Sequence, residues 1–265
     1  MDQTFLLKLL LSFFIGGIWI TFATIIAERF GSKLGGVIAG IPSTIIISLF
    51  FIGWTQSPII ASKATTVVPI IMGIDALFVV VYALLRNRQF YIAIACALIF
   101  WAVSSFILAL VGFDSFLISL IGFVVLVVLS YYILEKRYSF PSESPKYTKY
   151  TLPLLAIRGI LSGSIIAFAV LMAKIAGPLV GGMFSAFPAV MLSTMIITYY
   201  SHGTNFSLAV LKIITVSGPI NVVAYAIAVR YLYGSVGLFW GTVLSFIVSL
   251  ISSFLVYQFV KRKMI

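Results

Sequence analysis

Residues 35–42 read GGVIAGIP and residues 181–188 read GGMFSAFP, so a glycine pair runs into a proline at two places 146 positions apart. The same offset places Gly17 on Gly163, and it needs no gap from the start of the first apolar segment well into the third. Chance similarity between apolar segments does not keep glycines and a proline in register. The pattern therefore predicts an internal repeat.

The composition predicts a membrane protein. Of 265 residues, 62% are hydrophobic, which is well above the usual share for a soluble domain. Only 9% are charged, and the mean hydropathy is +1.22. Runs of about 20 apolar residues predict transmembrane helices, because the backbone must satisfy its hydrogen bonds within each segment. We expect an all-α, polytopic fold. Its nine predicted segments are 5–26, 34–52, 65–85, 90–111, 116–134, 154–175, 179–200, 208–232 and 236–260.

The basic residues indicate orientation. The formal net charge is +11, but Lys and Arg form short clusters between apolar runs, so we expect a lipid bilayer as partner and no nucleic acid. Short loops rich in Lys and Arg stay in the cytoplasm. This predicts a protein of the cytoplasmic membrane with its amino terminus outside and its carboxyl terminus inside.

The fifth segment, 116–134, decides the topology. The repeat covers four helices in each half, and after a two-residue slip Ser104-Ser105-Phe106 meets Ser252-Ser253-Phe254. Because the fifth segment has no counterpart, an odd number of crossings precedes the second half, which must then be inverted. The expected division is 1–112 for the first repeat, 113–152 for the connecting helix and polar linker, and 153–265 for the second repeat. Inverted repeats are common in secondary transporters, although two-fold channels share them.

Polar and helix-breaking residues in the repeated segment predict a substrate site at the centre of the membrane. Proline removes an amide donor and clashes with the preceding turn, so both repeated helices should kink or break and free backbone groups there. A break before Ser43 would point the amide end of a half-helix at an anion or a carboxylate. The predicted substrate-binding residues in these segments are Pro42, Ser43, Thr44, Ser185 and Pro188, and the predicted hinge glycines are Gly35, Gly36, Gly40, Gly181 and Gly182. In the alternative interpretation, the glycines only permit close helix crossing and the prolines only bend.

Asp75 lies near the centre of the third segment, where an ionised carboxylate costs several kcal/mol. It could remain protonated, pair with a cation or line an aqueous cavity, and a protonatable carboxyl there could carry a coupling proton. The offset of 146 positions sets it opposite Asn221, whose amide both donates and accepts hydrogen bonds. We expect both residues to bind substrate. The alternative is an interhelical hydrogen bond that holds the halves together.

These residues predict a transporter of a small solute or ion that works by alternating access, with Asp75 as a possible proton carrier. A narrow channel and a non-transporting membrane scaffold are the alternatives. The chain has six acidic residues and one histidine, and no metal-ligand cluster or nucleophile–base pair can be assembled within the membrane. We therefore expect no enzyme activity, no metal and no cofactor.

At the repeated element the sequence resembles the GlpM-like family of small four-helix bacterial membrane proteins, in which a glycine-alanine stretch runs into a proline midway along the second helix. The corresponding residues are Ala39-Gly40-Ile41-Pro42-Ser43-Thr44 in the first half, and Ala186-Phe187-Pro188 followed by Ser201-His202-Gly203 and Ala209 in the second. The first half lacks the Ser-His-Gly turn. The resemblance implies two such units fused through the fifth helix, and it offers no substrate.

Overall fold

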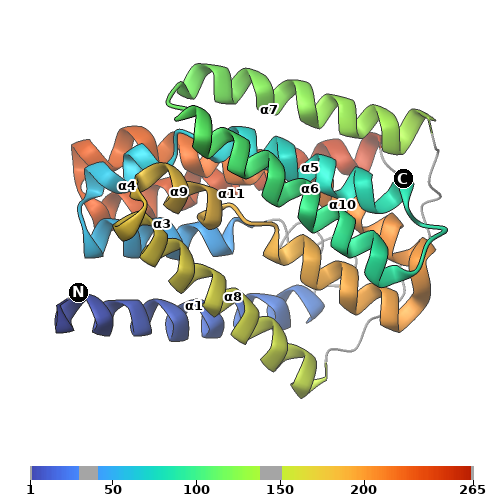
Figure 1. Cartoon of the computed structure of the whole chain (residues 1–265), viewed down its shortest axis with the longest axis horizontal. Coiled ribbons are helices and arrows are strands. Elements are labelled where there is room, and N and C mark those ends of the chain that lie inside the picture. Colours follow the sequence, from blue (N-terminus) through green and yellow to red (C-terminus); the bar gives the residue numbers. More distant parts are fainter. Residues whose placement is uncertain (1, 30–40, 138–150, 264–265) are drawn as a thin grey trace.

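The computed structural model describes residues 2–29, 41–137 and 151–263, and all regular secondary structure within them is helical. The expected all-α fold is therefore confirmed for these residues (Figure 1). The helices are α1 (Gln3–Arg29), α3 (Ser43–Thr55), α4 (Pro58–Ala64), α5 (Val68–Leu84), α6 (Phe90–Val111), α7 (Phe116–Tyr131) continued by the π-helical η1 (Tyr132–Arg137), α8 (Leu152–Ile175), α9 (Gly177–Ser185), α10 (Ala189–Val236) and α11 (Leu238–Lys263).

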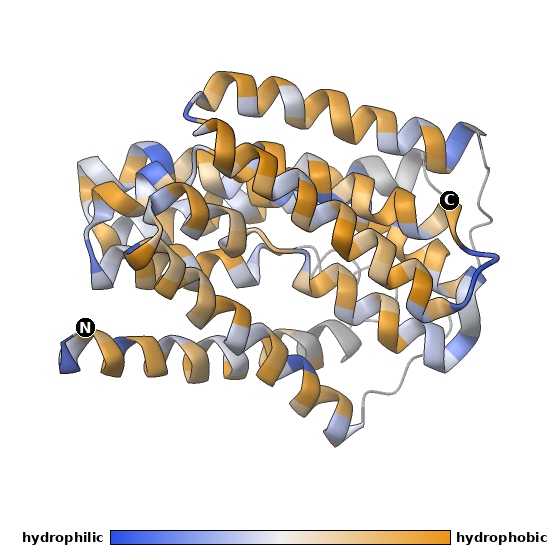
Figure 2. Cartoon of the chain, viewed as in Figure 1, coloured by the Kyte–Doolittle hydropathy of each residue, from blue (hydrophilic) through white to orange (hydrophobic). Residues whose placement is uncertain are grey.

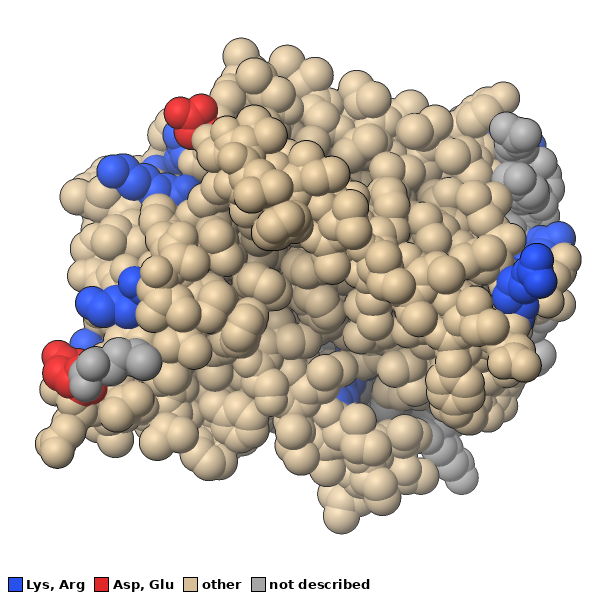
Figure 3. Space-filling model, in the orientation of Figure 1, with Lys and Arg blue, Asp and Glu red and all other residues tan. Residues whose placement is uncertain are grey.

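The chain is a membrane-embedded protein. Within the described residues, six helical stretches are long and apolar enough to cross a bilayer, or seven if α4 and α5, which meet at an angle of 42°, form one broken span. Helices α6 and α7 consist mostly of hydrophobic residues (Figure 2), and many of their large apolar side chains are exposed. On the face shown in Figure 3, charged side chains gather toward the two ends of the long axis, and apart from one basic group in the lower middle the surface between them is uncharged. This distribution matches a bilayer's hydrocarbon centre and polar faces.

The predicted segments correspond to helices in the residues that the structure describes, and the seventh segment is broken. The seventh segment is α9 followed by the first part of α10, and the eighth is the rest of α10. Gly203 divides α10, because its φ of 84° and ψ of −178° are not helical. Of the second segment, the part after Pro42 is α3, and residues 34–40 lie outside the described residues.

Helices α1 and α8 cross at close range and run in opposite directions (Figure 1). A Cβ atom added to Gly17 would lie 2.8 Å from the carbonyl oxygen of Gly159, and one added to Gly163 would lie 2.5 Å from that of Phe13. Only glycine permits this approach. At the offset of 146 positions Gly17 corresponds to Gly163 and Phe13 to Gly159, so each of the two contacts is the repeat image of the other.

Candidate functional site

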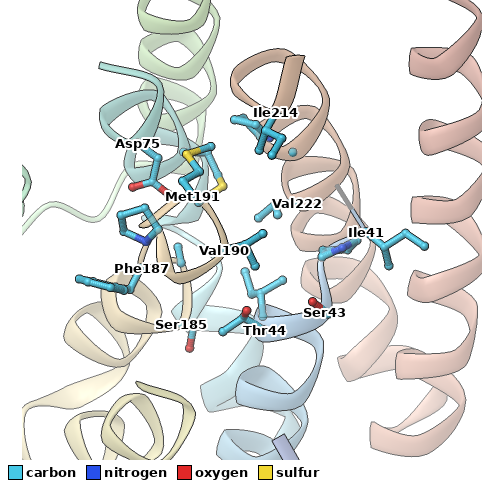
Figure 4. A pocket seen from close by; sticks show the side chains of 17 residues that line it. Ile41, Ser43, Thr44, Asp75, Ser185, Phe187, Val190, Met191, Ile214 and Val222 are labelled. Atoms are coloured by element: carbon cyan, nitrogen blue, oxygen red, sulfur yellow. The ribbon is translucent and has the colours of Figure 1, made fainter. Parts of the chain in front are cut away.

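A cavity of about 60 Å³ lies between the two repeats (Figure 4). Its lining residues are Ile41, Pro42, Ser43, Thr44, Ile45, Met72 and Asp75 from the first repeat, and Ser185, Ala186, Phe187, Pro188, Val190, Met191, Ile214, Gly218, Pro219 and Val222 from the second. Six of the seven predicted substrate-binding residues therefore line one space, although they come from three different helices and from the positions directly before α3 and α10. Asn221 is the exception.

Two helices begin at this cavity in the same way, one in each repeat. Pro42 precedes α3 with φ −74° and ψ 52°, and Pro188 precedes α10 with φ −74° and ψ 45°. The N–H of the next residue donates to the carbonyl oxygen two positions back at 2.7 Å in both cases, in Ser43 to Ile41 and in Ala189 to Phe187. The prolines thus set the same local geometry twice, as the sequence repeat predicts.

The first turns of α3 and α10 present unpaired amide donors. The start of a helix leaves several N–H groups without an intrahelical acceptor. The N–H groups of Thr44 and Ile45 in α3, and of Val190 and Met191 in α10, have no acceptor among the described residues, and neither helix has a side-chain cap. All four residues line the cavity. Both amide ends are therefore available to a ligand.

The hydroxyl groups of Ser43 and Thr44 are also available. These side chains are only 8% and 7% exposed, and neither hydroxyl has a hydrogen-bond partner among the described residues. Two neighbouring buried hydroxyls are bonded: Ser48 donates to the carbonyl oxygen of Thr44 at 2.9 Å, and Ser185 to that of Gly181 at 2.8 Å. Away from the cavity, the buried hydroxyls of Ser105, Ser245 and Ser253 also have no partner among the described residues. Ser43 and Thr44 stand in the first turn of α3, directly after Pro42.

Asp75 extends from the middle of α5 to the cavity wall and is 1% exposed. Its Oδ1 accepts a hydrogen bond from Nε1 of Trp101 in α6 at 2.9 Å. Among the described residues, its second carboxyl oxygen has no partner and no Lys, Arg or His lines the cavity. The carboxyl is therefore held on one side and faces the cavity without a basic partner.

Asn221 lies on the same helix as the cavity residues Pro219 and Val222, but its side chain serves the contact between α10 and α11. Its Oδ1 accepts from Ser252 at 3.0 Å, and its backbone carbonyl accepts from Ser249 at 3.4 Å. It is fully buried. These hydrogen bonds are interhelical, but they join two helices of the second repeat and not, as the alternative interpretation from the sequence expected, the two halves.

The structure places the predicted hinge glycines away from the bend where it describes them. Gly181 lies inside α9 against Ala173 of α8, and Gly182 against the carbonyl group of Ala64 in α4. The chain bends several residues later, between Ser185 and Pro188. These two glycines permit close packing, while Gly35, Gly36 and Gly40 lie outside the described residues.

Sequence reasoning missed two features of the site. Trp101 was not identified as the partner of Asp75, and no sequence signal pairs an indole with a carboxyl 26 positions away. Met72 could have been found, because it precedes Asp75 by three positions and therefore shares its helix face.

The strong charges near the helix ends are engaged outside the cavity. Lys212 Nζ lies 2.7 Å from a carboxyl oxygen of Glu135 in η1, and Arg230 donates to the Thr66 hydroxyl at 3.0 Å. Within the part of the chain that the structure describes, no three His, Cys, Asp or Glu side chains gather in an arrangement that could hold a metal ion.

Comparison with known proteins identifies the repeated unit. A family model described as "Protein of unknown function (DUF3147)" matches residues 9–114 and, separately, residues 155–262. The two matched regions lie on either side of α7, so the unit occurs twice in tandem. No curated protein and no solved structure matches the chain.

Proposed function

We propose, from the premise that this chain belongs to the DUF3147 family and carries two tandem copies of its unit, that it is a carrier of a small solute or ion. In this proposal the substrate occupies the cavity between the repeats and is exposed in turn to the two faces of the membrane. The observation that carries the proposal is the convergence of two proline breaks, one from each repeat, with the buried carboxyl of Asp75 on one cavity.

The crossing of α1 and α8 supports an inverted arrangement of the repeats. The contact of Gly17 with Gly159 corresponds, at the offset between the repeats, to the contact of Gly163 with Phe13. A two-fold axis relating the two repeats would superpose one contact on the other. The α8 residues that contact successive positions of α1 have falling residue numbers, so the two helices are antiparallel. A two-fold axis that relates antiparallel helices is perpendicular to them. If the helices cross the bilayer, the axis lies in the membrane plane, as in transporters with inverted repeats.

The positions of the chain ends support the proposed topology of nine crossings with the amino terminus outside and the carboxyl terminus inside. The start of α1 and the end of α11 lie at opposite ends of the long axis (Figure 1). The clusters of Lys and Arg assign the carboxyl-terminal end to the cytoplasm. We also propose that each half is related to the GlpM-like family. In the same proposal the protein is not an enzyme and has no cofactor.

The proposed mechanism uses the breaks as the mobile part. A helix broken at Pro42 or Pro188 has fewer backbone hydrogen bonds to hold it rigid, so the half-helices on each side can tilt around the bound substrate. Asp75 takes up or releases a proton as the cavity turns from one face to the other. Exchange of the two inverted halves between equivalent conformations provides the two access states.

Cysteine accessibility tests the proposal without knowledge of the substrate. In a Cys96→Ala background, Thr44→Cys and Val190→Cys place a thiol on the cavity wall from each repeat, and Thr215→Cys provides a buried control away from it. We expect a membrane-impermeant maleimide to label the two cavity thiols from either side of oriented vesicles and to spare the control. A scaffold with a permanently closed cavity would be labelled from neither side.

Counterflow separates a carrier from a channel. In proteoliposomes, a carrier shows saturable uptake that is accelerated by unlabelled substrate on the opposite side, whereas flux through a pore follows the gradient. A panel of radiolabelled small anions, cations and neutral solutes is sufficient for this measurement. Labelling from both sides without accelerated exchange for any permeating solute would contradict the carrier mechanism.

A further inference from the structure

We infer that the cavity binds a small monovalent anion of the carboxylate type together with one proton, which is held on Asp75. This inference rests on the proposed function, since it names the substrate class of the same cavity. It is supported by unpaired hydrogen-bond donors at the starts of α3 and α10 and by the position of the Asp75 carboxyl at the cavity wall.

The cavity is richer in hydrogen-bond donors than in acceptors. Four backbone N–H groups in the first turns of α3 and α10 have no acceptor among the described residues, and the buried hydroxyls of Ser43 and Thr44 add two more donors. Among the lining side chains, only the free oxygen of Asp75 offers a strong unpaired acceptor. A ligand that satisfies this set must mainly accept hydrogen bonds, and a carboxylate with two oxygens can face two amide ends.

The helix dipoles favour one negative charge. Each helix start is equivalent to a partial charge of about +0.5, so the two together offset about one unit of negative charge. The carboxyl end of α9 also reaches the cavity: Gly182 and Met183 accept from the N–H of Ala186, and Phe184 accepts from that of Phe187, while the carbonyl groups of Ser185 and Ala186 have no donor among the described residues. The four unpaired amide donors at the starts of α3 and α10 outnumber these two carbonyl groups.

Asp75 must be neutral when the anion is present. In a buried site a carboxylate and a bound anion would repel each other strongly, and none of the described lining residues supplies a compensating positive charge. The elements that pack against α5 are α6, α7, η1, α9 and α10. Their acidic, basic and histidine side chains all lie outside the cavity lining: Glu135, Lys136, Arg137, His202, Lys212 and Arg230.

A proton on Asp75 resolves the conflict, because the carboxylic acid then donates its O–H to the ligand while Trp101 still donates to the other oxygen. In the empty cavity the ionised carboxyl can itself face the amide ends. Anion binding and proton uptake are therefore coupled one to one, and the coupling is reciprocal.

The size of the cavity restricts the ligand. Sites for larger organic molecules occupy at least about 300 Å³, whereas about 60 Å³ accommodates a few waters or an anion with few non-hydrogen atoms. The remaining wall is apolar, with Met72, Phe187 and Met191 among its residues. This wall suits the hydrogen or short alkyl group of a carboxylate.

Formate is the probe for a binding experiment on the purified, detergent-solubilised chain. Choline formate is titrated by calorimetry between pH 5 and pH 8, with choline gluconate as an anion too large for the cavity and sodium gluconate as a source of a small cation. We expect formate binding that weakens by about tenfold per pH unit where the unliganded Asp75 is ionised, because one proton is taken up with each anion. Binding heat on titration with sodium gluconate, but not with choline formate, would overturn the inference and indicate a cation site.

Two substitutions separate the roles of the groups. Asp75→Asn keeps a donor at the carboxyl position without a titratable proton, so formate binding should become independent of pH. Thr44→Val removes one free hydroxyl at nearly constant shape and should weaken binding by about tenfold to hundredfold. Thr215→Val is the matched control, because this buried hydroxyl bonds to the Leu211 carbonyl at 2.8 Å and does not line the cavity.

Failure of this inference can be distinguished from failure of the proposed function. Cavity thiols labelled from both sides, without formate binding at any pH, would leave the carrier in place and remove the anion. Formate binding with the predicted pH slope, in a protein labelled from one side only, would retain the site chemistry and remove alternating access. An unfolded Asp75→Asn protein would leave Thr44→Val as the deciding variant, and unchanged affinity in that variant would contradict the inference.

Discussion

The two repeats begin their broken helices with the same backbone geometry but line the cavity with different side chains. In the first repeat Pro42 is followed by Ser43 and Thr44, and both hydroxyls are unpaired. In the second, Pro188 is followed by Ala189 and Val190. The carboxyl of Asp75 faces the cavity, whereas its counterpart Asn221 is turned toward α11.

This difference indicates which properties a duplicated unit must keep. A proline fixes the start of a helix through its own ring, so both copies retain the break as long as both retain the proline. The side chains around a cavity between the copies are shared by both, so polar groups from one copy are enough to bind a ligand. In the proposed site, the first repeat supplies Asp75 and two hydroxyl groups, and the second supplies a matching backbone and most of the apolar wall. The following predictions test this division, from the largest expected effect to the smallest.

The close crossing of α1 and α8 should be equally sensitive to a larger side chain at Gly17 and at Gly163. Gly17→Leu and Gly163→Leu each force a side chain into a backbone carbonyl of the opposite helix, and we expect each to cost about 3 kcal/mol or more and to remove most folded protein. The readout is the monodisperse fraction in size-exclusion chromatography after extraction. Gly234→Ala is the control, because no atom lies within 4 Å of the added Cβ. Tolerance of one leucine but not of the other would show that the crossing is not symmetric.

The polar residues should not be interchangeable between the repeats. We expect Asp75→Asn to reduce uptake driven by a pH gradient by at least about tenfold, since the variant can carry no proton. Asn221→Asp should not restore it in the double variant, because this position faces α11 rather than the cavity. The measurement is uptake of radiolabelled formate into proteoliposomes at an imposed pH gradient. Recovery in the double variant would mean that the two repeats are functionally equivalent.

The repeats also differ at the turn after their broken helices. At the offset of 146 positions Ser57 corresponds to Gly203: Ser57 has φ −169° and caps α4 through a bond from the N–H of Ile60, whereas Gly203 has φ 84° and ψ −178°. The conformation of Gly203 is nearly restricted to glycine, so Gly203→Ala should cost about 1–3 kcal/mol. Loss of the cap in Ser57→Ala should cost about 1 kcal/mol. Thermal unfolding compares them, and a greater loss from Ser57→Ala would contradict this assignment.

The sequence could predict the parts of the site that depend on local covalent chemistry. A proline disfavours a helical turn before it, and α3 and α10 begin directly after Pro42 and Pro188, whereas Pro219 is tolerated inside α10. The register between the repeats could also be predicted from the sequence, because the spacing of glycines and prolines is the same in both halves. Glycine alone was ambiguous: the close contacts of Gly181 and Gly182 depend on neighbours in α8 and α4 that the local sequence does not specify.

The direction of the central polar side chains could not be predicted. Asp75 and Asn221 occupy equivalent positions in sequence, yet one faces the cavity and the other faces α11. A small rotation of a helix about its axis is enough for this difference, and packing against the neighbouring helices sets that rotation. The bond from Trp101 to Asp75 depends on the rotation of two helices at once, so it requires the structure.

The smallest expected effect compares the two hydrogen bonds that fix these side chains. Trp101→Phe removes the donor to Asp75 but keeps an aromatic ring near Phe187, whose centroid lies 4.8 Å from that of Trp101. Ser252→Ala removes the donor to Asn221. Hydrogen bonds between membrane helices contribute about 0.6 kcal/mol on average and rarely reach 2 kcal/mol, so both variants should fold, with a modest loss of thermal stability. Only Trp101→Phe should also change formate affinity, because it frees a carboxyl that faces the cavity. Equal effects on binding would show that Asn221 takes part in the site, and the division between a polar and an apolar repeat would then be wrong.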